Sequence, residues 1–428
     1  MHWTPPHHPR RGALSRRTAG GVGLAMLVVF SPLLGAAAAS AVPGDATTSS
    51  TTSAPAPTST VMPGSTAATT PLTDRTPVAP EPPAPDPSAH IRVLLARIGV
   101  LDIQAALTAG RQQAASARAD HTTADAALAQ AVQAQHDADD QLQAARTQLG
   151  SSAAYAYMHA AGGDFVSVLQ GDSTGGGNEQ ELFAASIDHH RQLVVDAHAM
   201  VASAGAAVSA AQGADEQAQQ AASNQDNLVS TASVALDDAH RELATAAADE
   251  NLPVTATSWQ LPLEGPSTFT ADELGQWYAA QGHGSQATAP MADLAGFFID
   301  QGHAEGIRGD MAFAQSIHET GWFANNDTIT ANNFAGIGHC SDCPGGFPFV
   351  SAEVGVLAQI QLLKSYAETN PTYNSPRADP NINGPAGCCQ TWTQLGGVWA
   401  SDTNYGPHIL ARYADMLEWL VVHRSATG

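Results

Sequence analysis

The chain has 428 residues, of which 40 are acidic and 17 are lysine or arginine, so its formal charge is −23 at pH 7. A chain this acidic repels nucleic acid, and no basic stripe in the sequence offsets the repulsion. Most aromatic residues lie in residues 253–428, whereas the preceding residues are mostly Ala, Gln, Asp, Thr and Ser. We therefore exclude a nucleic-acid-binding protein and expect a packed core of ordinary density only in residues 253–428.

Residues 1–41 have the layout of a signal peptide. Arginines within residues 10–17 precede an apolar stretch, and residues 39–41 supply an A-x-A cleavage signal. An uncleaved membrane anchor is the alternative, because about 20 apolar residues can span a bilayer. The proline and the many small residues in the stretch favour cleavage. We expect an extracytoplasmic protein that is secreted or held in the cell wall.

Residues 42–90 are rich in Thr, Ser, Pro and Ala and contain few large apolar side chains. This composition buries too little apolar surface to offset the loss of chain entropy on folding. It predicts a disordered linker that acts as an extended tether or a simple spacer.

Residues 91–250 lack proline, and their apolar residues recur at three- and four-residue spacing. Alanine occupies most of these positions, so two helices, about 88–149 and 180–250, should pair closely but weakly as an antiparallel coiled coil. The glycine-rich stretch between them predicts a compact tip. This arrangement resembles the N-terminal coiled-coil segments of secreted bacterial peptidoglycan hydrolases, which occlude the catalytic domain or dock on a membrane partner. A rigid stalk is the alternative, and exposed Tyr155, Tyr157 and Phe165 would favour docking on a membrane-protein regulator.

The stretch AQSIHETGWFANNDTITANNFAGIG, residues 314–338, places a carboxylate at the end of an apolar helix. The helix is expected to start at Asp310 as its N-cap and to end at Glu319, beside Gly321, which lets the chain turn away. Partial burial against apolar rings and the negative end of the helix both raise the pKa of a glutamate there. Glu319 is then suited to protonate a departing glycosidic oxygen. The alternative is an ordinary helix-end residue paired with Arg308 or Arg412.

Three blocks of the sequence together resemble the bacterial glucosaminidase family, the mannosyl-glycoprotein endo-β-N-acetylglucosaminidase-like domain. They are AQSIHETGWF, NNFAGIG and GGVWASDTNYGPHIL, in the family's order and over about 100 residues. The resemblance implies a lysozyme-like, mainly helical α+β catalytic domain in residues 253–428 with a small β-lobe beside a sugar groove. It also implies hydrolysis of the β-1,4 bond after N-acetylglucosamine in the glycan strands of peptidoglycan, without a cofactor.

Carried over by position, the resemblance assigns roles to single residues. Glu319 matches the catalytic acid, and Tyr405 matches a tyrosine of the groove. The residues expected to bind substrate are Gln315, Trp322, Asn332, Asn333, Phe334 and Trp399, with core packing the better interpretation for Trp399.

The sequence departs from the family pattern in three ways. Phe323 stands where the family usually has glycine, and Ala335 is an insertion in the NN-x-FGI block. A second catalytic carboxylate is also not evident, because the short lobe contains only Asp342 and Glu353. Glu353 is explained equally well by a place in the first turn of the next helix. If neither acts on water, the N-acetyl group of the substrate would assist.

All four cysteines lie in the catalytic part, and an even number in an exported protein suggests two disulfides. Cys340 could pair with Cys343 and Cys388 with Cys389, or the two clusters could cross-pair. A zinc site is disfavoured by the adjacent cysteines. His318-Glu319 does not continue to an HExxH motif, since position 322 is tryptophan. We therefore expect no metal.

Two rival functions remain from the sequence. A lytic transglycosylase or muramidase would use one glutamate to cut the other glycosidic bond of the same polymer. A non-catalytic scaffold would bind wall glycan through a degenerate enzyme domain. The retention of Glu319 and Tyr405 argues against degeneracy.

Overall fold

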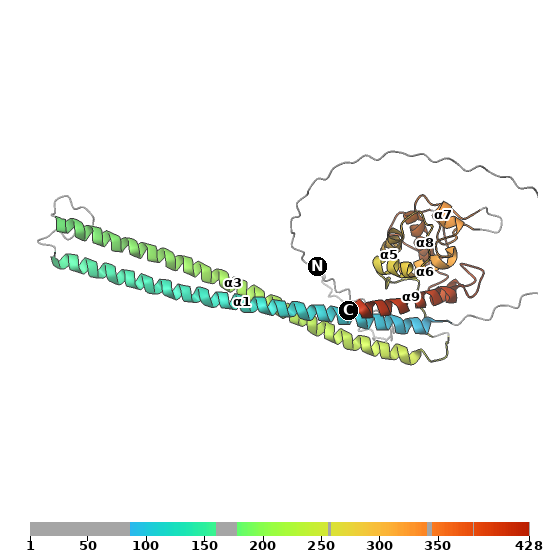
Figure 1. Ribbon diagram of the computed structural model, residues 1–428, viewed down its shortest axis with the longest axis horizontal. Coiled ribbons are helices and arrows are strands. Elements are labelled where there is room, and N and C mark those ends of the chain that lie inside the picture. Colours follow the sequence, from blue (N-terminus) through green and yellow to red (C-terminus); the bar gives the residue numbers. More distant parts are fainter. Residues whose placement is uncertain (1–85, 160–177, 256–257, 340–344, 380, 428) are drawn as a thin grey trace, which may run out of the picture. The chain divides into compact units, whose positions relative to one another are not determined.

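The computed structural model describes residues 86–159, 178–255, 258–339, 345–379 and 381–427. The signal peptide and most of the linker predicted from the sequence lie outside these residues. The described part is mainly helical, as predicted: two long helices form a hairpin, and a set of shorter helices forms a C-terminal domain. Figure 1 shows α1 and α3 running side by side in opposite directions.

The hairpin consists of α1 (Ser88–His159) and α3 (Asn178–Asp249). Small residues let the two backbones approach, and Leu142, Ala145 and Ala197 form a buried cluster between them. Other positions of the predicted seam, such as Ala127 and Ala134, are exposed, so the buried contact is intermittent. Both helices are long and apolar enough to cross a membrane by composition, which is weak evidence because helices of soluble proteins share this property.

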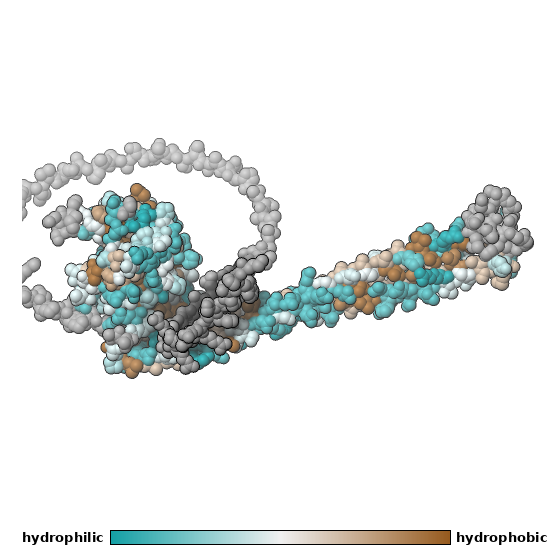
Figure 2. Space-filling model, turned by 180° about the vertical axis from the view of Figure 1, so that it is seen from behind, coloured by the Kyte–Doolittle hydropathy of each residue, from teal (hydrophilic) through white to brown (hydrophobic). Residues whose placement is uncertain are grey.

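Helix α1 extends ten residues beyond the predicted break at residue 149. Ala156 is buried against Ile187 of α3, and the ring of Tyr155 packs against Phe183. These contacts sustain the helix through the glycine and serines that suggested a turn. Apolar side chains are exposed near this end of the hairpin (Figure 2), and Tyr157 is 67% exposed.

The C-terminal domain contains six α-helices and one 3-10 helix among the described residues. They are α4 (Ala271–Ala280), α5 (Met291–Glu305), α6 (Gly309–Thr320), α7 (Asn326–Ala331), α8 (Ala352–Ala367), η1 (Trp392–Leu395) and α9 (Tyr405–Thr427). Thr270 and Glu273 form a capping box at the start of α4, and Ser351 is the N-cap of α8.

Helix α6 lies at the centre of this domain and contacts α5, α8 and α9. Its predicted N-cap was wrong, because Arg308 occupies that position. Asp310 lies in the first turn, fully buried, where its carboxylate accepts hydrogen bonds from the backbone of Thr268 and from the hydroxyl of Tyr413. Oδ2 of the carboxylate thus ties α6 to α9 and to the segment before α4, while Oδ1 accepts from the backbone N–H of Met311 in its own helix.

The first turns of α1 share the hydrophobic core of the C-terminal domain. Ile91, Leu94 and Ile98 are buried in the same cluster as residues of α9. Arg424 of α9 also pairs with Asp102 of α1 and with Glu273 of α4. The base of the hairpin therefore contributes to the packing of the domain.

The small β-lobe expected around residues 339–355 contains no strand where the structure describes it. Residues 345–351 form bends and extended chain, while 340–344 lie outside the described residues. The β-type pairings among the described residues are isolated bridges, such as the one between Glu264 and Ile307.

Candidate active site

Glu319 lies in the last turn of α6, and the chain turns sharply just after it. Gly321, Trp322 and Phe323 have φ angles of 59°, 69° and 57°, so three consecutive residues adopt the left-handed conformation. A bulky residue in this conformation is strained by roughly 1–2 kcal/mol. Burial of the Phe323 ring among other phenylalanines offsets the strain and explains how it replaces the family's usual glycine.

Two donors from a distant part of the chain hold the Glu319 carboxyl group. The hydroxyl of Tyr405, the first residue of α9, donates a hydrogen bond to Oε1. The indole Nε1 of Trp399 donates to the same oxygen over 3.1 Å. Trp399 is half-buried and packs on the ring of Tyr366, so both of the predicted roles, site residue and core residue, describe part of its environment.

Burial raises the pKa of Glu319 above its ordinary value, because desolvation penalises the charged carboxylate. The hydrogen bonds from Tyr405 and Trp399, and the nearby His339, act in the opposite direction without cancelling the effect. Burial together with Glu319 raises the pKa of Tyr405 well above its ordinary value. The phenol therefore keeps its proton and remains a donor at every pH at which the protein would work.

The second carboxyl oxygen of Glu319 faces Gly336. A Cβ atom added at Gly336 would lie 3.4 Å from Oε2 and 3.9 Å from the ring of His339. His339 in turn contacts the buried carboxylate of Asp327 through Nε2. No hydrogen bond reaches Oε2 from the residues that the structure describes. Among the described residues, Oε1 and not Oε2 is therefore the oxygen that protein donors hold.

Gln315 is fully buried and does not face a groove, so its assignment as a substrate-binding residue was wrong. Its side chain donates to the hydroxyl of Tyr405 over 2.8 Å and accepts from Gln359 over 2.8 Å. Gln315 lies one turn before Glu319 on α6, so it acts from behind Tyr405. Nothing in the sequence distinguished this direction from one toward solvent.

Asn333 and Phe334 are also fully buried, which corrects their assignment as substrate contacts. The Asn333 side chain donates to the carbonyls of Ile337 and Phe347 and accepts from the backbone of Ile337. It fastens the loop that carries Gly336 toward Glu319. The two residues support the wall of the site from inside.

Asn332 and Trp322 are half-buried, and both already contact protein groups: the amide of Asn332 is hydrogen-bonded, and the ring of Trp322 packs against other side chains. Asn332 ends α7 in the left-handed conformation and donates to the carbonyl of Phe349 over 3.0 Å. The Trp322 ring stacks on His283 with centroids 3.9 Å apart, and the Arg412 guanidinium lies 5.0 Å from it. Neither the amide of Asn332 nor the indole of Trp322 is arranged as an open platform for a sugar.

The two candidates for a second carboxylate are not brought to Glu319 by the described structure. Glu353 is exposed in the first turn of α8, and its contact is with Gln301 of α5 over 3.5 Å. Asp342 lies outside the described residues. The same is true of Cys340 and Cys343.

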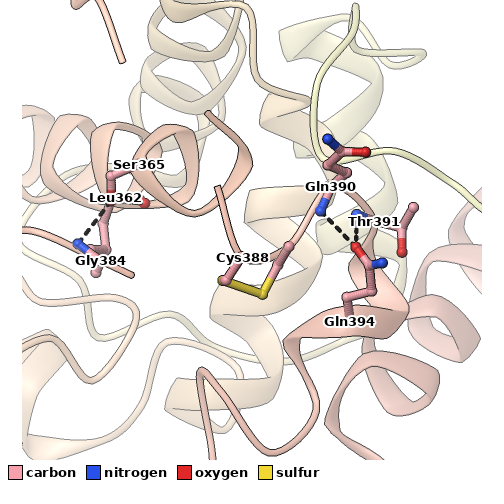
Figure 3. The surroundings of a disulfide bond; sticks show 8 residues. Leu362, Ser365, Gly384, Cys388, Gln390, Thr391 and Gln394 are labelled. Atoms are coloured by element: carbon pink, nitrogen blue, oxygen red, sulfur yellow. Dashed lines mark hydrogen bonds between the residues drawn. A yellow bond between two sulfur atoms is a disulfide. The ribbon is translucent and has the colours of Figure 1, made fainter. Parts of the chain in front are cut away.

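Cys388 and Cys389 form a disulfide with each other, which excludes cross-pairing of the two cysteine clusters (Figure 3). The bridge lies between the loop that packs on Ser365 of α8 and the start of η1. Among the described residues, no group of three or more histidine, cysteine, aspartate or glutamate side chains could hold a metal ion.

A carboxyl group with a raised pKa, held by a phenol and an indole on a helical scaffold, is typical of an acid–base enzyme site. Residues 295–417, which include this site, match the glucosaminidase family, described as mannosyl-glycoprotein endo-beta-N-acetylglucosaminidase. The match confirms the resemblance that the sequence motifs indicated, over residues 295–417. The description of that family supports a glycoside hydrolase domain that acts on a glycan.

A protein of Borreliella burgdorferi, named only as uncharacterized, is 30% identical to this chain over 135 residues. The similarity covers 31% of this chain and 66% of that protein. The chain thus spans just under two thirds of that relative's length, and the relative's name assigns no activity.

Proposed function

We propose that the protein is a secreted peptidoglycan hydrolase that cleaves the β-1,4 bond after N-acetylglucosamine, with Glu319 as the general acid. The observation that carries this proposal is the asymmetry of the Glu319 carboxyl group. Oε1 accepts from both Tyr405 and Trp399, whereas Oε2 faces Gly336 and the raised pKa favours the protonated acid.

In the proposed step, the bond between the anomeric carbon and the glycosidic oxygen breaks as that oxygen takes the proton from Oε2. Without this proton, the departing sugar would leave as an alkoxide, so a positioned acid contributes about 10²–10⁴ to the rate. Tyr405 and Trp399 then stabilise the carboxylate that forms on Glu319. Water adds to the anomeric carbon and loses its proton, which restores the acid.

The second group of the reaction is proposed from three candidates. Asp342 could activate water, and Glu353 is disfavoured by its exposed place on α8. The N-acetyl group of the substrate could instead attack the anomeric carbon, as in substrate-assisted glycosidases. Asp342→Asn and Glu353→Gln distinguish the two carboxylates from each other. The anomer of the first product distinguishes both from the N-acetyl group, because water activated by a carboxylate inverts the anomeric centre and the N-acetyl route retains it.

Peptidoglycan is proposed as the substrate because the sequence layout implies export and the family acts on glycans that contain N-acetylglucosamine. The formal charge of −23 is compatible with a neutral or partly cationic polymer. Export itself is tested by sequencing the N-terminus of the mature protein, which should begin at Val42 if residues 1–41 are cleaved.

The experiment is digestion of purified peptidoglycan by the full chain and by Glu319→Gln, followed by reduction and mass analysis of the new ends. We expect ends in reduced N-acetylglucosamine, and we expect the variant to lose them. Ends in N-acetylmuramic acid or its anhydro form would support the muramidase or transglycosylase instead. Binding without cleavage by either protein would support the scaffold.

A membrane-protein regulator that binds the hairpin is the partner we propose. The supporting observation is the group of exposed apolar residues at the end of α1 and the start of α3, among them Tyr155, Met158 and Leu182. Crosslinking in membranes from the producing cell should capture one partner with the native chain. A chain with Tyr155→Ser and Met158→Ser should lose it.

A further inference from the structure

A chain of hydrogen bonds runs from α8 through α6 to the proposed acid. The amide nitrogen of Gln359 donates to the carbonyl of Ala312 over 3.0 Å and to Oε1 of Gln315 over 2.8 Å. The amide nitrogen of Gln315 donates to the Tyr405 hydroxyl over 2.8 Å, and that hydroxyl donates to Glu319. Gln359 and Gln315 are both fully buried, so neither amide is open to solvent.

The chemistry of its first member fixes the direction of this chain. The Ala312 carbonyl can only accept, so the amide nitrogen of Gln359, not its oxygen, must face it. The other end of the Gln359 amide is its oxygen, which accepts from the hydroxyl of Ser316 over 2.8 Å. The same Gln359 nitrogen then requires the oxygen of Gln315, which turns the Gln315 nitrogen toward Tyr405.

The bond from Tyr405 to Glu319 follows because the Tyr405 hydroxyl has only one proton to donate. A nitrogen that donates to the Tyr405 oxygen obliges the hydroxyl to send its single proton elsewhere, and Oε1 of Glu319 is its acceptor. Oε1 also accepts from Trp399, so two donors point at this oxygen. A protonated Glu319 must therefore carry its own proton on Oε2.

We propose that Gln359 is a positioning residue that keeps the transferable proton of Glu319 on Oε2, acting through Gln315 and Tyr405. This inference rests on the proposed role of Glu319 as general acid. If the chain ran the other way, Tyr405 would donate to Gln315 and accept from Glu319. The acid's proton would then be held on Oε1 by the phenol, away from the glycosidic oxygen.

Other groups around the pair do not impose this direction. His339 faces Glu319 and lowers its pKa, while Tyr366 faces Tyr405 and raises the pKa of that phenol. The ring of His318 lies edge-on to Tyr405 with centroids 5.6 Å apart. The pKa of His318 is lowered by partial burial and then by His408, so it is largely neutral near pH 7.

The test measures initial rates of peptidoglycan cleavage against pH for the full chain and for Gln359→Met. Methionine keeps the length of the side chain but cannot hold the Gln315 amide in one orientation. We expect the maximal rate to fall about three- to tenfold, because part of the population presents no proton on Oε2. We also expect the basic limb of the profile to move up by about half a pH unit, as Glu319 loses part of a donor.

The matched control is Gln361→Met, the same substitution two residues later on α8. Gln361 is also buried, but its amide bonds to Glu305 and to the carbonyls of Ser375 and Pro376, away from the site. We expect Gln361→Met to lower the unfolding temperature without moving the pH profile. If Gln359→Met does not fold, Gln359→Asn breaks the same contact with Gln315 while keeping an amide.

A double-mutant cycle with Tyr405→Phe decides whether Gln359 acts through Tyr405. We expect Gln359→Met to change neither the rate nor the profile further in the Tyr405→Phe protein. The inference would be overturned if Gln359→Met lowered the rate and moved the profile as much in the Tyr405→Phe protein as in the unmodified chain. It would also be overturned if the pH profile of Gln359→Met overlaid that of Gln361→Met. Retention of cleavage by Glu319→Gln would instead refute the proposed function, so the two failures are distinguishable.

Discussion

The Tyr405 hydroxyl donates a hydrogen bond to Oε1 of Glu319, although 86 positions separate the two residues in the sequence. Tyr405 begins α9 and Glu319 lies in the last turn of α6, so the contact joins the start of one helix to the end of another. It stabilises the carboxylate that would remain after proton transfer. The predictions below follow from this pair and from the helices that hold it.

Tyr405→Phe should raise the pKa of Glu319, because the variant removes a donor that favours the charged carboxylate. The basic limb of the pH–rate profile should therefore move up by about one pH unit, and the maximal rate should fall about tenfold or more. Rates of cleavage across pH check this. An unchanged basic limb would show that the hydroxyl does not control the acid.

Glu319→Gln should make the folded protein more stable than the unmodified chain at neutral pH. The folded-state pKa of Glu319 is raised, so its contribution to stability is present below the unfolded pKa and is lost as pH rises through the folded pKa. Glutamine stays neutral and escapes this loss. Thermal unfolding of both proteins, from acid pH to about pH 8, measures the difference.

The difference in unfolding temperature should grow with pH and disappear at acid pH, where Glu319 is protonated. The comparison between the two proteins cancels other titrating groups, since they are the same in both. A difference that shrinks as pH rises would contradict the raised pKa.

Local signals in the sequence were enough to place Glu319 and the helix ends around it. Glu319 was recognised from the apolar helix before it and the glycine after it, and the caps of α4 and α8 follow from short-range chemistry. The directions of Gln315, Asn333 and Gln359 depend on packing between helices. A single sequence does not contain that information, so two buried residues were assigned to the substrate and the third was missed.

Phe323→Gly should destabilise the protein less than Phe323→Ala. Both variants remove the buried ring, at a cost of about 3–5 kcal/mol. Glycine also relieves the left-handed strain at φ 57°, whereas alanine retains it. Urea unfolding should give the glycine variant a free energy of unfolding about 1 kcal/mol higher than that of the alanine variant. Equal stabilities would show that the strain is absent.

Leu94→Ala should destabilise the C-terminal domain by about 2–4 kcal/mol, because Leu94 of α1 belongs to the core of that domain. Leu142→Ala is the matched control, since Leu142 is 7% exposed and Leu94 6%, but it lies in a separate cluster within the hairpin. Near-ultraviolet circular dichroism reports the tryptophans of the domain. Equal effects of the two variants on this signal would contradict a shared core.

Glu353→Gln should retain at least half of the cleavage rate, because Glu353 is exposed in the first turn of α8. Removal of the Glu353 charge should lower the stability of the protein by only a few tenths of a kcal/mol, through the lost interaction with the dipole of α8. Rates on peptidoglycan, with Asp342→Asn measured alongside, check this. A loss of a hundredfold or more in Glu353→Gln would identify Glu353 as the second catalytic group.

The central claim, that Glu319 donates the proton, is tested most directly by comparing two leaving groups. Dinitrophenolate is a stable anion and departs without a proton. The sugar that leaves from peptidoglycan must be protonated on its glycosidic oxygen as it departs. We predict that Glu319→Gln loses about 10²–10⁴ in rate on peptidoglycan but keeps most of the initial release of dinitrophenolate from a dinitrophenyl glycoside of N-acetylglucosamine oligomers. An equal loss on both substrates would contradict a role for Glu319 as the proton donor.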